Sequence, residues 1–143
     1  MTNTPAVARP QRPREPILVV EDDVLTRESL MALLQWDGYE TVGAGDGAAA
    51  LHLLRDGGVS PCLILLDLMM PVMDGWQFRA EQRADPALSN IPVIVFSARL
   101  GVANAITSLE VVAALTKPVD SDRLLDLVER HTRTRPTAEA ARR

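Results

Sequence analysis

Acidic residues directly follow apolar runs at two places in this chain of 143 residues. Glu21, Asp22 and Asp23 come after the run ILVV. Asp67 comes after the run CLILL. Carboxylates held close together repel one another, which raises their proton affinity unless a cation neutralises them. Mg²⁺ takes oxygen ligands and usually binds one or two carboxylates together with a phosphate. If these segments lie side by side, the sequence predicts a site for a divalent cation.

The chain holds one lysine, Lys117, whereas fourteen arginines supply the rest of its positive charge. An ammonium is a compact charge that reaches one carboxylate or phosphoryl oxygen, while the arginine fork favours planar, bidentate pairing. Taken alone, Lys117 is equally well explained as a surface lysine before a turn. The bond to Pro118 is open to the cis form, which would aim the lysine inwards. Ser97, after the run VIVF, would add a hydroxyl group.

These side chains need strands to bring them together. Short apolar runs without alternation are typical of strands covered on both faces, and the chain has three, at 17–20, 62–66 and 93–96. Two weaker candidates lie at 39–44 and 111–116, and amphipathic helical patterns fill the intervals. The alternation predicts an α/β fold with a doubly wound parallel sheet and helices on both faces. Ligands of such sheets gather beyond the carboxyl ends of the strands.

Composition and charge limit the class of protein. The chain is 47% hydrophobic and 24% charged without a long apolar run, so we expect a soluble, cytoplasmic protein and no membrane span. The single cysteine, Cys62, excludes a disulfide framework and is expected to be a buried, inert thiol. Residues 1–15 and 132–143 are rich in Arg, Pro, Thr and Ala, which predicts disordered basic tails around one domain at 16–131. We expect these tails to be solvated, without direct contact to nucleic acid.

Four segments together resemble the receiver domains of two-component response regulators. They are ILVVEDDVLTR, LILLDLMMPVMDGW, VIVFSA and LTKP, in that order, and the resemblance covers residues 16 to about 131. The resemblance implies a five-stranded parallel sheet of the flavodoxin-like type, with strand order 2-1-3-4-5. It also implies a protein that signals in the cytoplasm after phosphorylation.

The resemblance assigns roles to individual residues. Asp67 would be the phosphoryl acceptor and a Mg²⁺ ligand. Asp22 would bind Mg²⁺ directly, Glu21 would act through water, and the backbone carbonyl of Met69 would be the third protein ligand. Asp23 falls outside the acidic pair, and we interpret it as a helix cap.

Two further residues would contact the phosphoryl group, Ser97 through its hydroxyl and Lys117 through a salt bridge. A phosphohistidine on a sensor histidine kinase or a histidine phosphotransfer protein would donate that group. The chain would then catalyse its own aspartyl phosphorylation and dephosphorylation, although its main role is signalling or phosphorelay. No helix-turn-helix or enzymatic output pattern is visible, so we expect a single-domain regulator that acts on a protein effector.

Departures from the receiver pattern keep other interpretations open. Ala114 stands where receivers commonly carry Tyr or Phe, which favours a second hypothesis: a scaffold that binds its partner without switching. An enzyme or cofactor protein on the same layout, such as a phosphatase or a flavodoxin, is disfavoured. A phosphatase usually has a second aspartate at the position of Met69, and a flavin phosphate needs donors where this chain has acids.

The segment before Lys117 also departs from the receiver pattern. It is slightly short and carries Asn104, Thr107 and Ser108, which predicts a fourth helix that is short, displaced or mobile. Arg99 is expected near the rim of the site, where it modulates phosphate loss, contacts a partner or is simply solvated.

Overall fold

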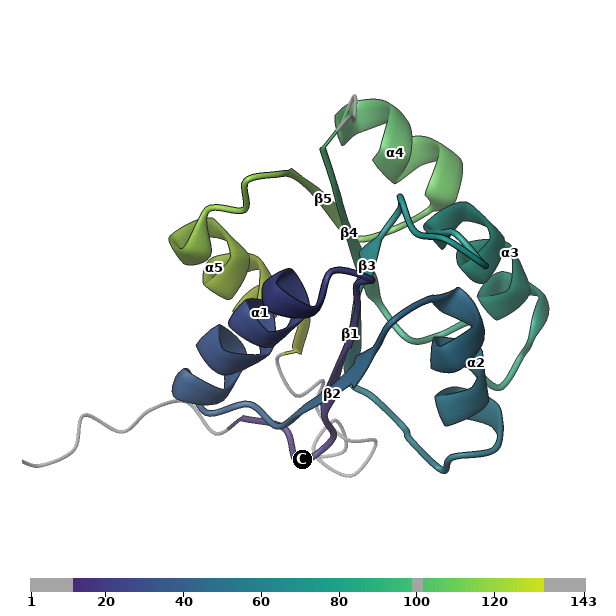
Figure 1. The fold of residues 1–143 in the computed structure, drawn as a ribbon, viewed down its shortest axis with the longest axis horizontal. Coiled ribbons are helices and arrows are strands. Elements are labelled where there is room, and N and C mark those ends of the chain that lie inside the picture. The colour runs from purple at the N-terminus through teal and green to yellow at the C-terminus, as the bar shows by residue number, and fades with distance from the viewer. Residues whose placement is uncertain (1–11, 99–101, 133–143) are drawn as a thin grey trace, which may run out of the picture.

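A computed structural model describes residues 12–98 and 102–132 of the chain. Its five parallel strands are β1 (Ile17–Val20), β2 (Thr41–Ala44), β3 (Leu63–Asp67), β4 (Val93–Ser97) and β5 (Ala113–Thr116). They pair in the order β2-β1-β3-β4-β5, as predicted (Figure 1). The helices are α1 (Val24–Trp36), α2 (Gly47–Arg55), α3 (Gly75–Ala84), α4 (Val102–Leu109) and α5 (Ser121–Thr132).

The helices cover both faces of the sheet, which confirms the doubly wound α/β architecture. Figure 1 shows α1 and α5 on one side of the strands, and α2, α3 and α4 on the other. Side chains alternate between these two layers along each strand. Leu18 and Val20 of β1 contribute to the core beneath α2 and α3, while Ile17 and Val19 contribute to the core beneath α1 and α5. Every residue of β1, β3 and β4 is buried, because these strands are covered on both faces.

The two weaker strand candidates form the edges of the sheet. β2 has three partly buried residues out of four, which explains why its apolar pattern is diluted. β5 ends at an exposed Thr116. Edge strands have one neighbour only, so their sequences carry less of the continuous apolar signal that identifies central strands.

Aspartates begin the helices that follow the strands. Asp23 accepts a hydrogen bond from the Thr26 amide at 2.9 Å, which confirms it as the cap of α1. The two hydrogen bonds from Thr26, through its hydroxyl and its amide, lower the pKa of the Asp23 carboxyl. Asp46 caps α2 by accepting from the Ala49 amide at 2.8 Å. The carboxylate of Asp23 therefore caps α1, next in sequence to the acidic pair Glu21 and Asp22.

The packed unit includes two residues that the sequence analysis assigned to the tails. Arg12 pairs with Asp37 at 2.9 Å and lies over the ring of Tyr39. Thr132 is buried at the end of α5, and its hydroxyl lies 3.3 Å from the Tyr39 hydroxyl. Residues 13–15 are described as well, and the carbonyl of Glu15 accepts a hydrogen bond from the Cys62 thiol at 3.3 Å. The predicted disorder of residues 1–11 and 133–143 falls outside the described part of the chain. Within the described part, no helix is long and apolar enough to cross a membrane.

Cys62 is partly buried at the start of the second continuous apolar run, 62–66. Burial raises the pKa of its thiol to about 11, so the reactive thiolate is scarce at neutral pH. This agrees with the expectation of an inert thiol.

Helix α4 has eight residues and is the shortest of the five described helices, as predicted from its composition. Its last carbonyl groups are held by a buried arginine from α3. Arg79 donates to the carbonyl oxygen of Leu109 at 2.9 Å and to that of Glu110 at 2.8 Å. Arg79 also donates to the side-chain oxygen of Gln82 at 2.7 Å. A cation at this end of a helix is favourable, because the unpaired carbonyls carry partial negative charge.

We expect Arg79→Met to destabilise the protein by about 2–3 kcal/mol, because two buried acceptor oxygens and one partly buried one lose a charged donor. Amide exchange of α4 should accelerate more than that of α5. Arg83→Met is the matched control, since Arg83 makes an exposed salt bridge with Glu110 and should contribute about 1 kcal/mol or less. Equal exchange of α4 in both variants would contradict the anchoring role of Arg79.

Candidate functional site

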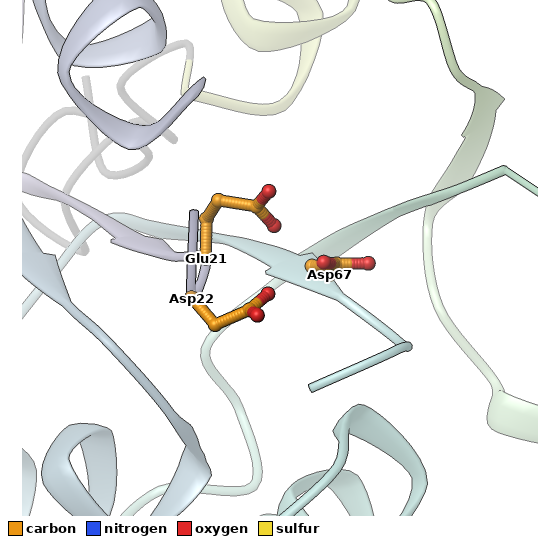
Figure 2. A group of neighbouring side chains, drawn as sticks. All are labelled: Glu21, Asp22 and Asp67. Carbon is orange, nitrogen blue, oxygen red and sulfur yellow. The ribbon is translucent and has the colours of Figure 1, made fainter. Parts of the chain in front are cut away.

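Three carboxylates converge at the carboxyl ends of β1 and β3. Glu21 and Asp22 follow β1, Asp67 ends β3, and the two strands are direct neighbours in the sheet. Each of these acids offers an oxygen that lies within 4.8 Å of the other two (Figure 2). Glu21 and Asp67 are each only 1% exposed, whereas Asp22 is exposed. The predicted convergence of acids from two segments is therefore present in the structure.

Lys117 lies against two of these acids. Its ammonium nitrogen is 3.0 Å from Glu21 Oε1 and 3.3 Å from Asp67 Oδ2. The Lys117–Pro118 peptide bond is cis, the form that the sequence left open. Burial by itself lowers the pKa of Lys117, but the hydrogen bond to Glu21 and the nearby carboxylate charges outweigh it and raise this pKa. The lysine is therefore charged at neutral pH and is not an ordinary surface lysine.

Glu21 shows that one ammonium does not balance the cluster. Burial, followed by the contact with Asp67, raises the pKa of the Glu21 carboxyl to about 8. Its buried Oε2 atom has no hydrogen-bond partner among the described residues. A buried acceptor without a donor is costly, and so is a group of carboxylates short of positive charge. Both observations fit a divalent cation, for which these oxygens are suitable ligands.

Asp67 is fixed by groups on both sides of its carboxylate. The backbone amide of Met69 donates to Oδ1 at 3.1 Å, and Lys117 lies at Oδ2. The amide of Gly75 donates to the carbonyl of Leu68 at 3.1 Å, which closes the loop between β3 and α3. The backbone of Met69 therefore lies next to the Asp67 carboxylate, which it contacts through its amide group.

Ser97 reaches the same end of the sheet. It is the last residue of β4 and is buried, and its carbonyl accepts from the Lys117 amide at 2.9 Å. Ala114 is buried in β5, in the core beneath α2 and α3. Arg99 lies outside the described residues.

One neighbour of the cluster was missed in the sequence. Arg27 of α1 donates from Nη1 to the backbone carbonyl of Glu21 at 2.6 Å. The available signal was Gly43 within the strand candidate at 39–44, because a glycine leaves a gap between the side chains on one face of a strand.

A family model described as the response regulator receiver domain matches residues 17–129. The chain belongs to this family. Receiver domains are the phosphoryl-accepting modules of two-component signalling, and an acidic pocket is typical of them. The cluster of Glu21, Asp22 and Asp67 is such an acidic group.

Curated relatives of this receiver are longer proteins. The DNA-binding response regulator MtrA of Mycolicibacterium paratuberculosis is 37% identical over 97 residues, which are 68% of this chain and 41% of that protein. The probable transcriptional regulator ycf27 of Guillardia theta is 38% identical over 97 residues, or 68% of this chain and 36% of that protein. The chain thus matches about two fifths of the length of these relatives.

Solved receiver structures share its fold. The signal receiver domain of a histidine kinase from Syntrophus aciditrophicus superimposes with a TM-score of 0.74 at 30% identity, covering 87% of this chain and 96% of that one. A response regulator receiver protein from Pseudomonas putida superimposes with a TM-score of 0.72 at 32% identity. The match covers 84% of this chain and 99% of that one. The response regulator TrrA of Thermotoga maritima, solved in complex with Mg²⁺-BeF, superimposes with a TM-score of 0.71 at 27% identity. The match covers 82% of this chain and 98% of that one.

Proposed function

We propose that this receiver domain accepts a phosphoryl group on Asp67. The observation that carries the proposal is the position of the Lys117 ammonium, which contacts both buried carboxylates, those of Glu21 and Asp67. A charged lysine in this place can follow negative charge as it moves from the carboxylate to a phosphoryl oxygen.

The acids divide into an acceptor and cation ligands. Asp67, exposed Asp22 and the carbonyl of Met69 would hold Mg²⁺ directly, and buried Glu21 would act through water. When bound, Mg²⁺ neutralises charge on the phosphoryl oxygens during transfer. The unpaired oxygen of Glu21 and its raised pKa support a cation here.

The transfer itself needs an ionised Asp67. A carboxylate oxygen attacks the phosphorus of a phosphohistidine in line, forming an O–P bond while the P–N bond breaks. The imidazole leaves with the electron pair and takes a proton from solvent. Lys117 and the hydroxyl of Ser97 would contact the phosphoryl oxygens. Water would later attack the phosphorus, breaking the O–P bond, releasing inorganic phosphate and returning the carboxylate, so the domain would catalyse both halves of its cycle.

The donor would be a sensor histidine kinase or a histidine phosphotransfer protein. Phosphorylation adds roughly one negative charge at this end of the sheet. We propose that a protein effector in the cytoplasm reads this change and that the domain acts without direct contact to nucleic acid. DNA binding is stated for the longer relatives such as MtrA, of which this chain matches 41%.

We expect the wild-type protein to gain the mass of one phosphoryl group when it is incubated with acetyl phosphate and MgCl₂. Asp67→Asn should gain none, because an amide oxygen is a poor nucleophile. Asp74→Asn is the matched control, since Asp74 caps α3 on the same loop and lies outside the acidic cluster. A wild-type chain without added mass, or an Asp67→Asn chain with it, would contradict the assignment.

A scaffold that does not switch is the second candidate, favoured by the buried Ala114 in β5. Such a protein would bind its partner with the same affinity before and after treatment with acetyl phosphate. A change in affinity that Asp67→Asn abolishes would exclude this candidate.

A further inference from the structure

Arg27 contacts the acidic site although the proposed transfer makes no use of it. It lies near the start of α1 and is partly buried, and its Nη1 donates to the backbone carbonyl of Glu21 at 2.6 Å. Glu21 is the first residue after β1, where the regular pairing with β2 and β3 stops. A guanidinium from the neighbouring helix therefore holds the backbone at the point where the acidic pair begins.

One glycine, Gly43, makes room for this side chain. Gly43 of β2 pairs with Val19, whose side chain belongs to the core beneath α1 and α5. A Cβ on Gly43 would lie 3.1 Å from Arg27 Cδ and 2.8 Å from Met31 Sδ. A Cβ on Gly45 would lie 3.6 Å from Arg27 Nη1, an ordinary contact. Glycine weakens a strand, so its presence at position 43 indicates that the space is needed.

The contact controls the geometry of both acids that follow β1. A peptide unit is planar, so the direction of the Glu21 carbonyl fixes the plane that joins the Cα atoms of Glu21 and Asp22. A hydrogen bond from a charged donor is among the stronger ones in proteins. The ammonium of Lys117 faces the carboxylates, whereas Arg27 acts on the backbone between them.

We propose that Arg27 is a positioning residue, which holds Glu21 and Asp22 in the arrangement that binds a divalent cation, and that Gly43 admits it. The inference rests on the proposed cation site and extends it to two residues that are not ligands. Loss of the contact would free the peptide between the two acids and weaken cation binding without removing any ligand atom.

The test is titration of the whole chain with MgCl₂ by calorimetry. We expect Arg27→Met to weaken Mg²⁺ binding about tenfold, the effect of losing one charge-assisted hydrogen bond. Arg27→Lys should recover part of the affinity, because it retains a charged donor. The sign is decisive: if Arg27 were only a nearby positive charge, its removal would strengthen the binding of a cation.

Gly43→Ala supplies an independent variant. Its added methyl group would crowd both Met31 Sδ and Arg27 Cδ. We expect it to weaken Mg²⁺ binding in the wild-type background through Arg27, and therefore to have no further effect in the Arg27→Met background. Without Mg²⁺, the NMR shifts of the Glu21 carbonyl carbon and the Asp22 amide should move in both single variants. Unchanged shifts, or an Arg27→Met chain that binds Mg²⁺ as well as wild type, would overturn the inference alone. A wild-type chain without Mg²⁺ binding would overturn the proposed function too.

Discussion

Gly75→Ala is expected to lower the free energy of unfolding by about 3 kcal/mol or more and to disturb the loop after Asp67. The added Cβ would lie 2.6 Å from the carbonyl oxygen of Asp67 and 2.7 Å from the Cα atom of Leu68. Both are backbone atoms of the segment that carries the acceptor, so no side chain can turn aside to make room. The loop or the start of α3 must move instead.

Urea unfolding measures this loss, and Gly58→Ala is its control. Gly58 has a φ of 69°, but an added Cβ there would meet no atom within 4 Å. Gly58→Ala should lower the free energy of unfolding by only roughly 1 kcal/mol, which is the cost of placing alanine in the left-handed backbone conformation. If Gly75→Ala lowers the free energy of unfolding no more than Gly58→Ala does, the result would contradict the close approach of α3 to the strand that carries the acceptor. The same variant should also lose Mg²⁺-dependent phosphorylation.

Stability without divalent cations is expected to fall as the pH rises from about 4.5 to about 8, because of Glu21. The native state raises the pKa of this carboxyl from its ordinary value of 4.5 to about 8, mainly through burial. Within that window the native state binds more protons than the unfolded chain, so stability is lost with increasing pH. The expected loss is on the order of several kcal/mol.

The comparison with Glu21→Gln isolates this effect, since glutamine does not titrate. The difference in unfolding free energy between wild type and Glu21→Gln should decline with pH across the window. MgCl₂ should reduce the decline, because a bound cation favours the ionised carboxylate. Parallel pH curves for the two proteins would show that the native state does not raise the pKa of Glu21.

The sequence by itself determined the architecture and the location of the site. Three continuous apolar runs predicted β1, β3 and β4, and Asp23 predicted the start of α1. Carboxyl ends of parallel strands lie at one edge of a sheet, so the order of the motifs along the chain was sufficient to bring the acids and Lys117 together. The edge strand β2 was harder to predict, because one of its faces accommodates Arg27 and carries glycine there.

Only the tertiary structure decided how the charges within the site differ. Glu21 and Asp22 are adjacent in sequence, yet one is buried against Lys117 and the other is exposed. The sequence likewise did not predict the contact of Arg79 with the end of α4 or that of Arg27 with the Glu21 carbonyl. Local periodicity records which face of an element is apolar. Hydrogen-bond partners, burial and pKa depend on how segments far apart in the chain pack together, as Glu21 and Lys117 do.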